Sequence, residues 1–277
     1  MSIAIRAGLG AAMLVGALFL IVAVPRAAPV RVAEFVADCP ASHRGPDDPI
    51  VYPGRPGSSH LHEFFGNRST DAFSTAKSLR EAGTTCKPRG DRSAYWVPVL
   101  EQANGEPIDV LEGTFYYVSS HQDRRDLRLW PPGLRMVAGY DYGPPGGAAR
   151  WSCRGSGIPS DRTIPRCPEG NPLELLLNFP DCWDGERRDA PGHHEHMAYS
   201  VAGNCPKDHP VEVPGLRYKL LYDSLGGGDV RLSIGADEAS LAHGDFFDAW
   251  KRSALRHRVR DCLVRRVKCG ADGRPAP

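Results

Sequence analysis

The sequence predicts a mainly β fold: a single-domain β-sandwich or barrel-like core with Pro/Gly-rich loops, disulfides and a C-terminal helical segment. First, short runs of β-branched and aromatic residues alternate with turn-forming residues, and the 277 residues include 30 glycines and 25 prolines. Second, the eight cysteines form an even set that suits disulfide bonds. Third, residues 238–268 contain neither proline nor a strand-like alternation.

The strands are expected in segments rich in Val, Leu, Tyr and Phe. Residues 93–110 predict two strands around an Asn-Gly turn. The other expected strands are residues 50–52, 112–120, 133–140, 173–179, 196–201, 217–223 and 229–235. A series of strands separated by Gly/Pro turns is typical of a sandwich or barrel-like core.

Two segments predict helices. In residues 71–83, Asp71 is a candidate N-cap and Leu79 closes an apolar face. In residues 238–268, one or two amphipathic helices are indicated by Leu241, Trp250, Leu255, Val259 and Leu263. Their exposed face is expected to hold Lys251, Arg252, Arg256, Arg258, Arg260, Arg265, Arg266 and Lys268. That basic face either meets an anionic polymer or is an ordinary solvated helix side.

Residues 1–28 predict a signal peptide or an uncleaved N-terminal anchor. Arg6 precedes a run without charge from Gly8 to Val24, and small residues follow. The run is near the lower length for a membrane span, so both interpretations stay open. Residues 29–270 are then a single secreted or cell-envelope domain, and residues 271–277 a disordered tail. Membrane contact is expected only through the N-terminal segment, if it is uncleaved.

All eight cysteines follow the predicted signal, and an even number in an exported chain implies disulfides. Short sequence separations favour three pairs, and a fourth follows by elimination: Cys153–Cys167, Cys182–Cys205, Cys262–Cys269 and then Cys39–Cys86. The alternative is a structural zinc site, but the chain has no C-x-x-C pair.

The segment SSHLHEFFG, residues 58–66, carries the first candidate metal ligands. On an extended segment, His60 and His62 point to the same side. Two imidazoles on one side can bind one metal ion or serve in catalysis. The alternative is a polar turn in which each imidazole bonds to the backbone.

Two more segments contain candidate ligands. GHHEHMAY, residues 192–199, has three histidines in four positions, so His196 can share a side with either His193 or His194. HGDFFDAW, residues 243–250, repeats the order of a histidine, an acid and two phenylalanines, which makes His243 a candidate. The alternatives are a solvated loop for the first segment and a helix start for the second.

The candidate catalytic carboxylates are Asp48, Asp181, Asp184 and Asp245. A glycosidase needs two facing carboxylates about 5–10 Å apart. Asp181 and Asp184 flank Trp183, whose indole face suits a sugar ring. Asp245 can orient an imidazole or accept a hydrogen bond from a sugar hydroxyl. Turn formation is the alternative for Asp181 and Asp184, because aspartate often bonds to its own backbone in loops.

Several function classes are disfavoured by the sequence. The net charge of +1 provides no global attraction to nucleic acid, so no such partner is expected. The chain has no G-x-S-x-G elbow, no P-loop, no H-E-x-x-H and no Rossmann glycine pattern. The oligomeric state stays open.

Several motifs in order resemble one secreted family of bacteria and fungi that is known only as a domain of unknown function. They are DPIVYPGRPGSSHLHEFFGN, TTC, SAYWVPVL, FPDCWDG, HMAYS and HGDFFDAW, and the resemblance covers roughly residues 35–270. Some fungal members also carry a cysteine-rich module that binds cell-wall sugar, which implies a cell-wall setting but no reaction. The family pattern matches at His193 and His196, whereas His194 falls at a variable position. Gly244 stands where alanine is usual, and Asp245 is kept.

Three hypotheses follow. In the first, a histidine-lined pocket binds Cu or Zn, cell-wall polysaccharide, or both, and hydrolysis uses one or more of the four aspartates. The histidines of this pocket are His60, His62, His193, His196 and His243. In the second, the protein is a non-catalytic glycan-binding module with Trp96, Trp130 and Trp183 as stacking residues. In the third, it is a disulfide-stabilised structural surface protein. We favour the first for the site and leave turnover open.

Overall fold

A computed structural model describes residues 33–119, 126–139, 143–144, 147–157, 162–234 and 241–275. Residues 31–277 form one compact unit, and the site lies within it. The signal peptide or anchor expected at residues 1–28 lies outside the described residues. Among those that are described, no helix is long and apolar enough to cross a membrane.

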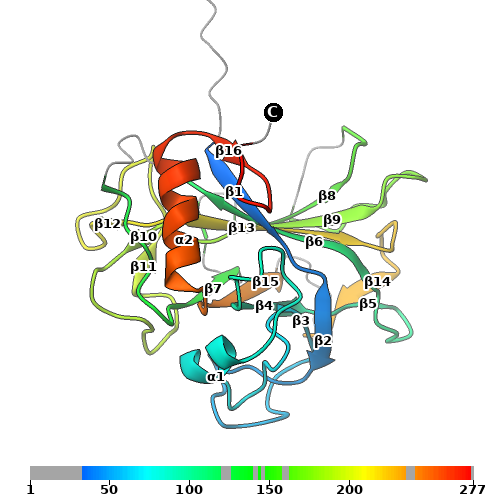
Figure 1. The fold of residues 1–277 in the computed structure, drawn as a ribbon. Helices are drawn as coiled ribbons and strands as arrows, with labels where there is room; N and C mark the ends of the chain where they lie inside the picture. The colour runs from blue at the N-terminus through cyan, green and yellow to red at the C-terminus, as the bar shows by residue number, and fades with distance from the viewer. Residues whose placement is uncertain are drawn as a thin grey trace, which may run out of the picture. The chain divides into compact units, whose positions relative to one another are not determined.

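Two large sheets dominate the fold (Figure 1). The six-stranded sheet has the order β16 (Lys268–Cys269), β1 (Glu34–Asp38), β6 (Val110–Val118), β13 (Gly215–Tyr222), β9 (Leu173–Asn178) and β8 (Ala149–Cys153). The five-stranded sheet has the order β2 (Ala41–Gly45), β3 (His62–Gly66), β4 (Ala94–Pro98), β15 (His243–Phe247) and β7 (Arg135–Gly139). All neighbouring strands in both sheets are antiparallel except β1 and β16.

The remaining elements are short. A three-stranded sheet joins β11 (Met197–Ala198), β10 (Cys182–Trp183) and β12 (Val211–Glu212), and a two-stranded sheet joins β14 (Val230–Leu232) and β5 (Leu100–Gln102). The helices are α1 (Ala76–Glu81), α2 (Arg252–Arg258) and the π-helical turn η3 (Val259–Val264). The predicted mainly β class is therefore confirmed.

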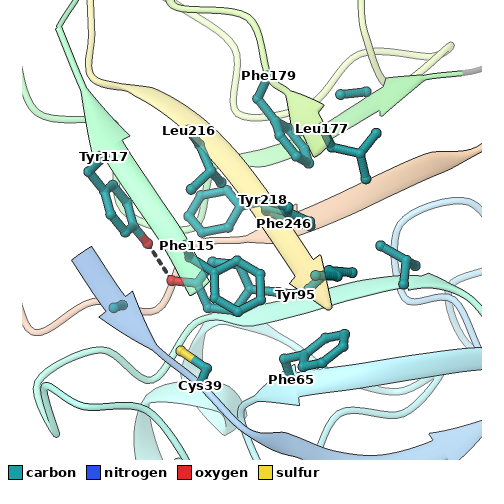
Figure 2. Close-up of a cluster of buried hydrophobic side chains, with 14 of the residues drawn as sticks. Cys39, Phe65, Tyr95, Phe115, Tyr117, Leu177, Phe179, Leu216, Tyr218 and Phe246 are labelled. Atoms are coloured by element: carbon teal, nitrogen blue, oxygen red, sulfur yellow. Dashed lines mark hydrogen bonds between the residues drawn. The ribbon is translucent and has the colours of Figure 1, made fainter. Parts of the chain in front are cut away.

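An aromatic layer joins the two large sheets (Figure 2). Tyr95 on β4 lies 4.1 Å from Phe115 on β6, measured between ring centroids, and 5.4 Å from Phe246 on β15. Phe115 in turn lies 4.7 Å from Tyr218 on β13. Since these rings come from both sheets and are fully buried, the sheets pack face to face around one core.

The outer face of the five-stranded sheet is also buried, and this face positions the site. Alternate residues of a strand point to opposite faces. On β4, Tyr95 belongs to the main core, whereas Trp96 belongs to a second apolar cluster. On β15, Phe246 belongs to the main core and Phe247 to the second cluster. His243, Asp245 and Phe247 are alternate residues of β15, so all three side chains lie on the outer face. Ile50, from the loop before β3, helps to cover this face.

Most expected strands are confirmed, but residues 50–52 form a turn and not a strand. The Asp48 carboxylate explains this, because its Oδ1 accepts hydrogen bonds from the backbone N–H groups of Ile50 and Val51. The helix expected in residues 71–83 is shorter, and its N-cap is Thr75. Asp71 instead accepts a hydrogen bond from the N–H of Phe73 within a turn.

The helical prediction for residues 238–268 is wrong at β15. Residues 243–247 form an inner strand between β4 and β7, and all five are buried. A strand buried on both faces does not alternate between polar and apolar residues, so the sequence lacked the usual signal. The helix α2 begins at Arg252. Arg258, expected on the exposed face, is buried and its Nη2 donates to the carbonyl of Ala271 at 2.8 Å.

The four expected disulfides are confirmed, and no described cysteine is free. The pairs are Cys39–Cys86, Cys153–Cys167, Cys182–Cys205 and Cys262–Cys269. Disulfides of this number fit an extracellular or cell-envelope location.

Candidate metal centre

Three histidines meet beneath the loop that precedes β3. His62 is the first residue of β3, His243 is the first residue of β15, and His60 lies two residues before His62. The ring centroids are 4.2 Å apart for His60 and His62, 5.1 Å for His60 and His243, and 6.0 Å for His62 and His243. Their ligand atoms lie within 4.8 Å of one another. We call these three residues the nitrogen set.

Backbone carbonyls fix the tautomers of two of these rings. The Nδ1 of His62 lies 3.0 Å from the carbonyl of Asp47, and the Nδ1 of His243 lies 3.1 Å from that of Leu241. A carbonyl only accepts, so each Nδ1 carries the hydrogen and each Nε2 has the lone pair. Metal-binding histidines are commonly oriented in this way.

The backbone between His60 and His62 is also held in place. The Leu61 carbonyl accepts hydrogen bonds from the N–H of Val99 at 3.0 Å and from the hydroxyl of Ser233 at 2.6 Å. This extended segment places both imidazoles on the same side, as the H-x-H spacing predicted.

Burial keeps the nitrogen set neutral. It lowers the pKa of His60 to about 4 and that of His243 to about 3. The pKa of His62 falls well below its ordinary value because of burial, with smaller effects from His60 and His243. Neutral imidazole is the form that binds metals, so these rings are ready ligands at neutral pH. His62 and His243 are buried, whereas His60 is partly exposed beside the loop of residues 51–58.

Two carboxylates also lie close to His62. Asp48, His62 and Asp245 offer ligand atoms within 4.8 Å of one another, and we call them the oxygen set. Asp48 is 3% exposed and Asp245 is 1% exposed. Burial raises the pKa of Asp48, and it raises that of Asp245 well above its usual value, with a further contribution from Asp48. Neither oxygen of Asp245 has a hydrogen-bond partner, and Oδ2 lies 4.0 Å from the Nε2 of His243.

Both sets fit a metal ion. Zinc ligands lie about 2 Å from the ion, so small inward movements of ligand atoms at these separations suffice. Further buried polar atoms without a hydrogen-bond partner beside the two ligand sets are the Nε2 atoms of His60 and His62. Buried polar groups are nearly always paired, so imidazole nitrogens without a partner here could serve as metal ligands. A third cluster joins Asp91 to Cys39 and Cys86, but those sulfurs form a disulfide and are not thiolate ligands.

His193 and His196 belong to neither ligand set among the described residues. The Nε2 of His196 lies 2.7 Å from the carbonyl of Arg135 on β7, and the side chain is fully buried. The Nδ1 of His193 lies 2.9 Å from Asp189 Oδ1, and its backbone has a positive φ of 63°. The geometry thus supports structural roles for both residues, and their metal ligation stays a prediction.

Asp181 and Asp184 take part in local structure away from both ligand sets. Asp181 accepts hydrogen bonds from the N–H and the hydroxyl of Ser200, both at 2.8 Å, and lines a separate hollow of about 280 Å³. Asp184 accepts from the N–H groups of Glu186 and Arg187 and pairs with the guanidinium of Arg187 at 2.6 Å. The Asp184 contacts match the turn formation that was the alternative in the sequence, whereas the Asp181 carboxylate bonds to Ser200, which is distant in sequence.

The tryptophans are poorly placed for stacking on a polymer. Trp96 and Trp130 are fully buried, so the structure contradicts their assignment as sugar-stacking residues. Trp183 is partly exposed and donates from Nε1 to the carbonyl of Arg187 at 2.6 Å. Sequence reasoning missed that Trp96 lies beside the site, with its ring centroid 6.5 Å from that of His62, although its place in a β-rich segment predicted a strand.

A family model described as "Domain of unknown function (DUF1996)" matches residues 48–250. The chain belongs to this family. The match begins at Asp48 and extends beyond Asp245, so all five residues of the two ligand sets fall inside the DUF1996 domain. Comparison with curated proteins and with solved structures found no match.

Proposed function

We propose that this DUF1996 protein is an exported or cell-envelope protein whose nitrogen set binds one divalent transition metal, Zn²⁺ or Cu²⁺. One observation carries the proposal: three imidazoles converge with their ligand atoms within 4.8 Å of one another, and the carbonyl of Asp47 leaves the Nε2 of His62 as the atom that can bind metal. Imidazole suits both metals. Sets of three histidines with an open fourth position are typical of catalytic zinc.

We further propose that the metal centre serves hydrolysis of a cell-wall polysaccharide. If His60, His62 and His243 held a zinc ion, that ion would supply an activated water at neutral pH. Asp245 lies beside His243 and its carboxyl is close to that of Asp48, so these two groups would be the ones to exchange a proton with the substrate or with such a water. Their burial leaves no room for a sugar ring between them, which argues against a glycosidase that uses the carboxylates alone.

Access to the site is expected next to His60. The other two histidines and both aspartates are almost fully buried, whereas His60 and the loop of residues 51–58 are at least partly exposed. A polymer therefore approaches over this loop, and the loop must move before a glycosidic bond reaches the metal. A non-catalytic glycan-binding module remains the second candidate function, weakened by the burial of Trp96 and Trp130.

The metal proposal is tested with protein purified without a polyhistidine tag. Metal analysis and calorimetric titration with Zn²⁺ and Cu²⁺ should give one bound ion per chain. His60→Asn and His243→Asn should lose most of this binding, while His257→Asn on the exposed side of α2 should keep it. Binding that is unchanged in both ligand variants would rule out the nitrogen set. Incubation of the loaded protein with cell-wall polysaccharides then separates hydrolysis, seen as released oligosaccharides, from binding without products.

A further inference from the structure

The oxygen set suggests a second way for this pocket to hold a cation. It shares only His62 with the nitrogen set. Two of its three ligands are carboxylates, whereas the nitrogen set consists of imidazoles alone. Ligand type is a main source of metal selectivity in proteins, because carboxylates suit Mn²⁺ and Mg²⁺ and imidazoles suit Zn²⁺ and Cu²⁺.

Asp245 is the residue that points to a ligand. Its side chain is 1% exposed, and neither carboxylate oxygen has a hydrogen-bond partner. The nearest ring nitrogen, Nε2 of His243, is 4.0 Å from Oδ2, which is too far for a hydrogen bond. Burying a carboxyl group in this state is unfavourable unless a cation or donor joins it. Its position on an inner strand, in register with Val137 and Trp96, prevents it from turning to solvent.

Asp48 is already oriented for the same cation. The N–H groups of Ile50 and Val51 both donate to Oδ1 at 2.8 Å, which fixes the carboxylate plane. Oδ2 takes no part in these two turn hydrogen bonds. Preorganised ligands of this kind raise affinity, because they lose little freedom on binding.

His62 prevents the two sets from being filled together. Its Nδ1 donates to the carbonyl of Asp47, so only Nε2 has a lone pair. One lone pair binds one ion. A cation on the oxygen set therefore removes a ligand from the nitrogen set, and the reverse is also true.

We propose that these residues form a two-position cation site. A borderline-soft ion such as Zn²⁺ binds the nitrogen set, and a hard ion such as Mn²⁺ binds the oxygen set. The two positions cannot be filled together, because both need His62. The nitrogen position rests on the proposed function. The oxygen position rests independently on the unpaired, buried Asp245. The hard and soft cations available to the protein then decide which position is filled.

The experiment uses the full chain, freed of metal with a chelator. Mn²⁺ binding is followed by electron paramagnetic resonance, and Zn²⁺ binding by calorimetry. Asp48→Asn is the key variant because its amide oxygen keeps the turn acceptor for Ile50 and Val51. His60→Asn is its counterpart on the nitrogen set, and His62→Asn removes the shared ligand.

We expect Asp48→Asn to weaken Mn²⁺ binding at least about tenfold, while Zn²⁺ affinity changes by less than about threefold. His60→Asn should show the opposite pattern, and His62→Asn should weaken both ions. Zn²⁺ added to the Mn²⁺-loaded protein should release one Mn²⁺ for each Zn²⁺ bound. Thermal unfolding checks that each variant folds, and Asp245→Asn replaces Asp48→Asn if the latter does not.

Three results would overturn the inference. They are simultaneous binding of both ions, equal weakening of both by Asp48→Asn, and no Mn²⁺ binding by a protein that binds Zn²⁺ normally. The last result leaves the proposed function standing. Conversely, Mn²⁺ binding that depends on Asp48 in a protein without Zn²⁺ or Cu²⁺ binding supports the oxygen position and contradicts the proposed function.

Discussion

Asp91 is a buried acid whose replacement should change how stability depends on pH. It is fully buried beneath the aromatic layer, and its Oδ1 accepts from the N–H of Ser93 at 3.0 Å. Its Oδ2 accepts from the hydroxyl of Tyr95, which also bonds to Tyr117. Burial raises the pKa of Asp91 to about 7, although the hydrogen bonds from Tyr95 and Ser93 oppose the shift.

The size and sign of the effect follow from this pKa. The ordinary value is 3.8 and the folded value is about 7, a difference of about three units. Each unit corresponds to about 1.4 kcal/mol, so Asp91 changes the free energy of unfolding by about 4 kcal/mol. The folded state binds the proton more tightly. Asp91 therefore costs nothing below about pH 4, and it destabilises the protein increasingly as the pH rises to about 7.

The variant Asp91→Asn removes this titration but keeps an oxygen for Ser93. Urea unfolding of both proteins from about pH 4 to pH 8, with the disulfides intact, gives their stability difference at each pH. Between these limits the difference should move by about 4 kcal/mol in favour of the variant. Groups that do not interact with Asp91 cancel in the comparison, whereas Asp248, whose charge acts on Asp91, contributes a coupled change. Two profiles that stay parallel to within about 1 kcal/mol would refute a raised pKa for Asp91.

Three further changes test other parts of the fold. Burial raises the pKa of Asp248 to about 6, so Asp248→Asn should give the same sign of pH effect with a smaller size of about 3 kcal/mol, measured by the same unfolding series. At Gly139 φ is 110°, and an added Cβ would lie 2.4 Å from the carbonyl oxygen of Ala242 and 2.5 Å from the Cα of His243. Gly139→Ala should therefore lower the free energy of unfolding by about 3 kcal/mol or more and abolish the stabilisation by metal. Thermal unfolding with and without Zn²⁺ checks both effects. His196→Phe should cost about 1–3 kcal/mol, since the carbonyl of Arg135 loses its partner, yet calorimetry should show unchanged Zn²⁺ affinity.

Short-range features of the sequence predicted the structure best. The H-x-H spacing placed His60 and His62 on one side because side chains alternate along an extended segment. Three disulfides followed from short separations, and only one pair then remained. These inferences needed only local geometry or simple counting.

Which residues distant in sequence lie close together in the fold could not be predicted in the same way. His193 and His196 are clustered with His194 in sequence, yet their side chains bond to Asp189 and to the backbone of β7. His243 was found through its similar sequence context, but the expected helix start would have separated it from Asp245 by about 200° around the axis. The strand instead puts both on one face beside His62. Sheet order decides this, and the sequence contains no local signal for the insertion of β15 between β4 and β7.

The pocket also lowers the stability that the same fold would otherwise have. Apolar side chains at positions 243 and 245 would pack against Phe247 and Trp96 on the outer face of the sheet. The protein instead buries two acids and two histidines there, and each buried polar group without a partner costs about 1–3 kcal/mol. The aromatic layer on the opposite face and four disulfides offset that cost without using the pocket. A metal that binds only the folded chain would return stability that rises with the logarithm of its free concentration divided by its Kd, which makes an unfavourable metal-free site consistent with a site built for a cation.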